Sequence, residues 1–214
     1  RLDNKYICYT LIIMFEHYFK SLFMNKVNII IPFLIFVITF LFHKFIIHPV
    51  EAYVFLPENV EHASYLYLPH AVRIIAYYVL GPIALIPIFL SQCFTFILFN
   101  NGELFNTVYL STISTISIYF GFISYELIKK DNLFNINNTV DWKKIIIIGS
   151  LVSLFNSTLS TLYLNLEKGH NYFYETLNFT YLIGDVLGLV FGMVLFILSL
   201  KFYGRWRSNF EIKS

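Results

Sequence analysis

Apolar runs long enough to cross a lipid bilayer dominate this sequence between residues 27 and 200. A helix needs about 20 mostly apolar residues to span the hydrocarbon core of a membrane. Charged residues make up only 13% of the chain, roughly half the share found in soluble domains. So little charge cannot cover this much apolar surface in water. The sequence therefore predicts an all-α, polytopic integral membrane helical bundle.

Six stretches qualify as membrane-spanning helices. The apolar region 68–99 exceeds one span and is interrupted by Gly81 and Pro82. Proline cannot continue a helix and glycine commonly ends one, so we read this region as a hairpin that breaks at these two residues. Both arms are short, which leaves tilted or re-entrant geometry open. The predicted spans are residues 27–47, 68–80, 83–99, 104–128, 142–164 and 177–200.

These spans are predicted to form one transmembrane domain, residues 24–206. Met24 directly precedes the first apolar run, so residues 1–23 are either an N-terminal extension or the remnant of a longer protein. Residues 207–214 are predicted to be a cytoplasmic tail. The chain carries none of the sequence patterns of serine hydrolases, zinc metalloproteases or nucleotide-binding enzymes. We expect no enzymatic activity, no cofactor and no metal site.

Lysine and arginine gather on one side of this six-span topology. Cytoplasmic segments of membrane proteins carry an excess of these residues, so both termini are predicted to be cytoplasmic. The net charge of +2 gives no indication of nucleic-acid binding. The predicted inner side holds Lys20, Lys26, Lys129, Lys130, Lys143, Lys144, Lys201, Arg205, Arg207 and Lys213; the outer loops hold only Lys44 and Lys168, beside Glu51, Glu58, Glu61, Glu103, Glu167 and Glu175.

Arg73 and Asp185 are charged residues inside predicted spans. A charge there costs about 2.5–3.5 kcal/mol on insertion scales and usually faces protein or water. Counted from the outer ends of their helices, Arg73 lies about 7.5 Å deep and Asp185 about 12 Å deep. We predict that they pair or share a polar site in the outer leaflet, which includes His70. In the alternative, Arg73 reaches the membrane surface and Asp185 bonds a neighbouring hydroxyl or amide.

Glycines at every fourth position surround Asp185. Gly184, Gly188 and Gly192 lie on one helix face, where small residues let neighbouring backbones approach closely in lipid. The partner helix lies in the same chain or in a second copy, so a homodimer through the last helix is a candidate. The aromatic Tyr67 is read as part of an interfacial belt.

Polar side chains also fill the two predicted helices between the hairpin and the last helix. They are read as structural groups that bond across helices or back to carbonyls of their own helix, rather than as a substrate path. They are Thr107, Ser111, Thr112, Ser114, Thr115 and Ser117 in one helix, and Ser150, Ser153, Asn156, Ser157, Thr158, Ser160 and Thr161 in the other.

Two segments resemble the bacterial MASE-type integral membrane sensor domains. One is "YLPHAVRIIAYYVLGPIALIPIFLSQCF" at 67–94, and the other is "YLIGDVLGLVFGMVLFIL" at 181–198. The similarity extends over roughly residues 27–203. The matching positions are Pro69, Gly81, Pro87, Gly184 and Asp185. The resemblance implies a multi-pass sensor domain in a bacterial cytoplasmic (inner) membrane.

Three functions are consistent with these observations. The first is a sensor-like membrane domain in signal transduction, which has no output module in this chain and acts through a cytoplasmic or membrane signalling partner. The second is a small transporter subunit or substrate-binding membrane component. The third is a structural or assembly protein. In all three the lipid bilayer is the main partner.

Overall fold

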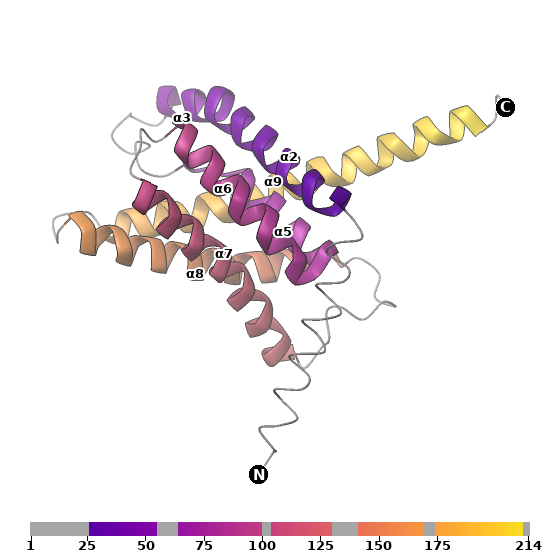
Figure 1. The fold of residues 1–214 in the computed structure, drawn as a ribbon. Coiled ribbons are helices and arrows are strands. Elements are labelled where there is room, and N and C mark those ends of the chain that lie inside the picture. The colour runs from indigo at the N-terminus through magenta and orange to yellow at the C-terminus, as the bar shows by residue number, and fades with distance from the viewer. Residues whose placement is uncertain (1–25, 55–63, 100–103, 130–140, 169–173, 212–214) are drawn as a thin grey trace, which may run out of the picture.

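A computed structural model describes residues 26–54, 64–99, 104–129, 141–168 and 174–211 (Figure 1). Across these residues the regular structure is helical throughout, and five helices are long and apolar enough to cross a membrane. The chain is thus an all-α, multi-pass membrane bundle, as predicted. The elements are α2 (Lys26–Phe42), a π-helix (His43–Ile47), α3 (His48–Val54), α5 (Pro69–Leu80), a 3₁₀-helix (Gly81–Ala84), α6 (Leu85–Phe99), α7 (Leu104–Lys129), α8 (Trp142–Lys168) and α9 (Tyr174–Glu211).

The first helical segment is longer than the sequence predicted. Its expected end was residue 47, but the chain continues through the π-helical turn into α3 and stays helical to Val54. Pro49 does not stop it, although proline lacks the N–H for one backbone hydrogen bond; it follows directly on the π-helical turn, where the hydrogen-bond ladder is already irregular. The predicted extension, residues 1–23, lies outside the described residues.

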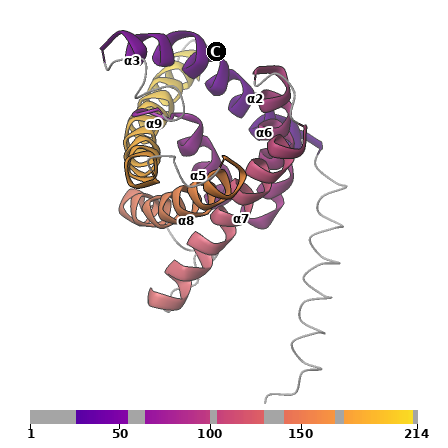
Figure 2. The ribbon, with the colours of Figure 1, turned by 90° about the vertical axis from the view of Figure 1, so that its left-hand side faces the viewer.

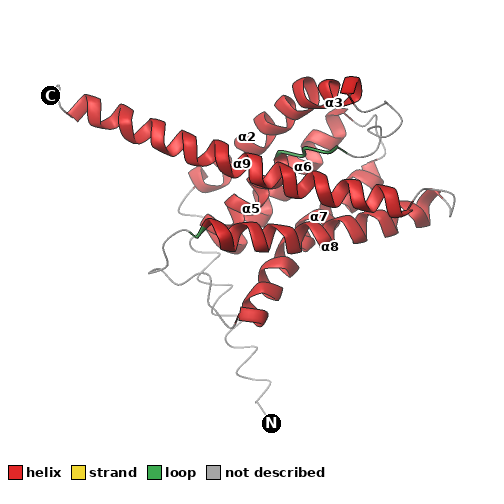
Figure 3. Ribbon diagram, turned by 180° about the vertical axis from the view of Figure 1, so that it is seen from behind, coloured by secondary structure: helices red, strands yellow, loops and turns green. Residues whose placement is uncertain are grey.

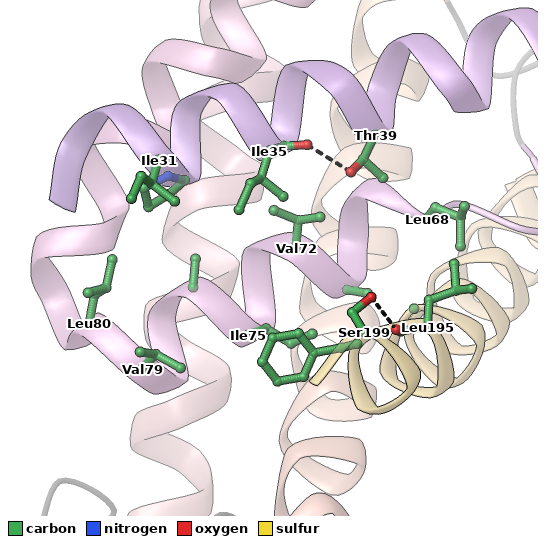
Figure 4. A pocket seen from close by; sticks show the side chains of 15 residues that line it. Ile31, Ile35, Thr39, Leu68, Val72, Ile75, Val79, Leu80, Leu195 and Ser199 are labelled. Atoms are coloured by element: carbon green, nitrogen blue, oxygen red, sulfur yellow. Dashed lines mark hydrogen bonds between the residues drawn. The ribbon is translucent and has the colours of Figure 1, made fainter. Parts of the chain in front are cut away.

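The chain reverses direction between α5 and α6. Leu80 ends α5, and Gly81 follows with a positive φ of 67°. On α2, Phe33 contacts Phe94 and Phe40 contacts Phe99, so α2 and α6 run in the same direction. The helix α5, however, runs opposite to α2: Ile31 and Leu80 lie at one end of the two helices, and Thr39 and Leu68 lie at the other (Figure 4). Gly81 and Pro82, where the sequence predicted the break, lie in the 3₁₀-helix between α5 and α6, and Pro69–Phe99 counts as one of the five candidate spans.

The helix α5 occupies the interior of the bundle, with the other helices around it (Figure 2). Its buried residues include Ile74 and Tyr77, and the Tyr77 ring packs against Phe122 of α7 at 4.3 Å between centroids. The helices α7 and α8 are antiparallel, since Tyr109 stacks on Tyr163 and Phe120 contacts Phe155. The interior position of α5 explains why polar groups on it can be shielded from lipid.

Residues 64–68 approach α5 as non-helical chain that lies against the glycine face of α9 (Figure 3). The Tyr67 N–H donates to the Gly184 carbonyl over 2.9 Å. A Cβ on Gly184 would collide with the Ser64 carbonyl, and one on Gly188 with the Tyr67 carbonyl. Non-helical backbone at membrane depth requires burial in protein, which this face provides. The glycines therefore contact an extended segment of the same chain, and only Gly192 faces a helix, at Ala71.

Gly188→Ala is expected to destabilise the protein much more than Gly149→Ala. The new methyl at 188 would meet backbone atoms of Tyr67 and Leu68, whereas at 149 it meets the mobile end of the Leu189 side chain. Overpacking of this kind costs about 1–3 kcal/mol, while alanine otherwise favours a helix by about 0.5–1 kcal/mol over glycine. Thermal unfolding in detergent measures both variants. Equal losses would contradict the packing described here.

Candidate functional site

Arg73 of α5 and Asp185 of α9 meet inside the bundle. Arg73 Nη2 donates to Asp185 Oδ1 over 3.5 Å, and each side chain is only 2% exposed. The sequence predicted this pair from the depths of the two residues, and the structure brings them together. The contact is longer than the roughly 2.7–2.9 Å of a strong charge-assisted hydrogen bond, so other groups share the stabilisation of both charges.

His70 lies one turn before Arg73 and is completely buried. Its Nε2 is 3.2 Å from the Gly149 carbonyl oxygen, which can only accept, so Nε2 carries the hydrogen. Its Nδ1 accepts a hydrogen bond from Arg73 Nη2 over 2.7 Å. This network makes His70 neutral. Its 3.3 Å approach to Asp185 Oδ2 is then a close contact and no ion pair.

Two further side chains complete the cluster, one from α7 and one from α8. Asn156 Nδ2 donates to Asp185 Oδ2 over 3.1 Å, and Arg73 Nη1 donates to the Ser114 hydroxyl. We call His70, Arg73, Ser114, Asn156 and Asp185 the polar centre. Its one positive and one negative charge cancel, which suits a site surrounded by apolar helices.

Tyr67 covers the polar centre from the side of the non-helical segment. The Arg73 guanidinium lies 5.6 Å from the centroid of the Tyr67 ring, at cation–π distance. The His43 ring packs nearly perpendicular to the same tyrosine ring, with 5.2 Å between the two ring centroids. The Tyr67 ring thus lies against Arg73, and its place in an interfacial belt stays a prediction.

Glu51 of α3 holds the other end of the same segment. The Ser64 hydroxyl donates to Glu51 Oε2 over 2.7 Å and accepts from the Leu66 N–H over 3.2 Å. The Glu51 side chain is buried, although the sequence predicted that it lies in an outer loop. Segment 64–68 is thereby attached to α3 through Ser64 and to α9 through Tyr67.

Some buried polar atoms near α6 and α7 make no hydrogen bond within the described part of the chain. They include Arg73 Nε, Gln92 Nε2 and Ser111 Oγ. A buried polar atom without a partner costs about 1–3 kcal/mol. Ser111 lies one turn from Ser114 on α7, and both are buried. These three side chains therefore keep unused hydrogen-bonding capacity in the interior of the described bundle.

Most other hydroxyls of α7 and α8 bond to their own helix. Thr115 donates to the Ser111 carbonyl over 2.8 Å, and Ser150 to the Ile146 carbonyl over 2.9 Å. Ser153 is different, since it crosses to the Leu182 carbonyl of α9 over 3.2 Å. Among the residues described, no three His, Cys, Asp or Glu side chains come together as a metal site would require.

Sequence reasoning assigned Asn156 and Ser114 only to a general set of polar residues. Both lie in apolar runs with several other hydroxyls, and nothing in their spacing distinguishes them. The Gly149 carbonyl and the Glu51–Ser64 bond had no sequence signal. Comparisons of this chain with models of protein families, with curated proteins and with solved structures found no match.

Removing either charge of the Arg73–Asp185 pair is expected to destabilise the protein strongly. Arg73→Met leaves a buried carboxylate and Asp185→Asn leaves a buried guanidinium, and breaking a buried pair costs about 3–5 kcal/mol. The double variant should lose less than the sum of the two, because it leaves no unpaired charge. A double-mutant cycle of unfolding in detergent measures this coupling, and additive losses would show that the two charges do not interact.

Proposed function

We propose that this chain is a sensor-like integral membrane domain without enzymatic activity. The observation that carries the proposal is that Asp185 lies on α9, and α9 continues without interruption to Glu211. The candidate membrane span of α9 is Asn178–Ser199. Figure 1 shows the remaining turns projecting away from the bundle. A change at the polar centre therefore has a direct mechanical connection to a segment that a partner can reach.

The polar centre has the properties that a switch needs. It is buried and electrically neutral, so one added proton or one charged ligand changes its net charge in a medium that penalises charge. Arg73 divides its hydrogen bonds among Ser114, His70 and Asp185. A bound group that competes for Arg73 would weaken the link between α5 and α9. Packed helices respond to such changes by discrete shifts of about 1–2 Å.

The topology proposed for this function has six crossings, with both ends in the cytoplasm of a bacterium and the chain in its inner membrane. The reversal at Gly81 supports counting α5 and α6 separately. Lys26, Lys129 and Lys143 lie at the ends of α2, α7 and α8, and Lys201 follows the candidate span of α9. These positions support the orientation. The signalling partner would bind the α9 extension. A homodimer through α9 would use its exposed side, which includes Phe191.

A small transporter subunit is the second candidate, and segment 64–68 favours it. Interrupted helices at membrane depth, next to charged groups, form substrate sites in several transporters. In that case a polar solute would bind beside Arg73. A ligand-induced thermal shift that is lost in Asp185→Asn, without any movement of the α9 extension, would favour this candidate over the sensor.

Asp185→Asn is expected to move the α9 extension in the sensor. Nitroxide labels at Ile128→Cys on α7 and Ser208→Cys on α9, in a chain with Cys8 and Cys93 replaced by serine, report the distance between the two helices. The mean distance should change by roughly 2 Å, the scale of helix shifts in switching proteins.

The matched control for this experiment is Leu187→Ala, which changes a lipid-facing residue of α9. It should leave the distance distribution as in the parent protein. Only protein that elutes as a single folded species is compared. If Asp185→Asn leaves the distance unchanged as well, the polar centre stabilises the fold and transmits nothing.

A further inference from the structure

An apolar cavity of about 510 Å³ lies between α2, α5 and α9, on the side of α5 that carries Val72, Ile75 and Val79 (Figure 4). Small residues of α5 and α9, Ala71, Ala76 and Gly192, contribute to its lining. Its rim is open, since Ile35 is 47% exposed, Val79 64% and Leu195 43%. The cavity is therefore a groove that faces the hydrocarbon of the membrane.

The lining of the groove offers nothing to a polar ligand. Its two hydroxyls are already bonded to their own helices: Thr39 donates to the Ile35 carbonyl over 2.7 Å, and Ser199 to the Leu195 carbonyl over 2.8 Å. The other lining side chains are apolar. The occupant of the groove must accordingly be hydrocarbon.

The groove has room for a linear hydrocarbon chain, since its volume is about 510 Å³. A flexible acyl chain can enter through the open rim, and the test below distinguishes it from a helix of a second copy.

Basic residues lie at one end of the groove. Ile31 and Leu80 are found at this end, whereas Thr39 and Leu68 lie at the other (Figure 4). Lys26 begins α2 five residues before Ile31. On α9, Lys201 follows the lining residue Ser199 by two positions, and Arg205 comes one turn later. Basic residues next to an apolar segment attract anionic lipid headgroups.

We propose that this groove binds one acyl chain of an anionic phospholipid, with the headgroup at the Lys26–Lys201 end. Hydrocarbon fills the space between α2, α5 and α9, and the basic residues select the charge of the headgroup. The site is separate from the polar centre, and it does not depend on the proposed sensor function. It places a lipid against Gly192 and Ala71, where α5 and α9 touch.

Native mass spectrometry of the purified protein tests this site. The protein is mixed with phosphatidylglycerol or phosphatidylcholine of identical chains. The parent protein should retain one phosphatidylglycerol at a concentration several-fold below that needed for phosphatidylcholine. Ala76→Phe fills the groove and should weaken retention at least tenfold. Ile35→Trp narrows the rim, and it tests the same point if Ala76→Phe does not fold.

The matched control is Ile38→Phe, which adds an aromatic ring at a residue of α2 that is 64% exposed and does not line the groove. It should bind lipid as the parent does. Lys201→Gln should reduce the preference for phosphatidylglycerol but retain chain binding. Unchanged lipid retention in both groove variants, equal binding of the two lipids by the parent, or a lipid-free dimer that both groove variants disrupt would each overturn the proposal.

Discussion

The buried attraction between Arg73 and Asp185 ties the interior helix α5 to α9. Neither charge can be placed alone in an apolar bundle at acceptable cost, and the two lie 112 residues apart in sequence. Their contact therefore fixes the position of α5 along α9. Apolar packing alone would specify this position less strictly, because apolar contacts are not directional. His70, Asn156 and Ser114 then take positions around the pair, because each supplies a hydrogen bond that one of the charges needs.

Close approach of backbones makes this arrangement possible. The pair requires α5 to begin deep in the bundle, so the chain must reach that depth through segment 64–68. Glycines at 184 and 188 leave room for its carbonyl groups. Glu51 fixes the outer part of the segment through Ser64, while Tyr67 both bonds to α9 and covers Arg73. Charge pairing, glycine spacing and the non-helical segment 64–68 are consequently parts of one solution to the same burial problem.

Hydropathy and charge predicted much of this structure from sequence. The long helices, the break at Gly81 and the meeting of Arg73 with Asp185 follow from run length, from proline and glycine, and from the cost of charge in lipid. Segment 64–68 was not predictable in the same way, since a non-helical stretch that packs on α9 has the same composition as the end of a helix. Asn156 was not distinguished from its neighbours either, because its choice of partner depends on how α8 is rotated against α9.

The helix α9 runs without interruption from Gly188 to Glu211. This part of α9 contains 23 residue steps, which correspond to about 35 Å along the helix axis. A tilt of about 5° at the glycine contacts would displace the far end by roughly 3 Å. Small adjustments in the tightly packed interior, too slight to break its hydrogen bonds, would thus produce a displacement of roughly 3 Å at the end of α9.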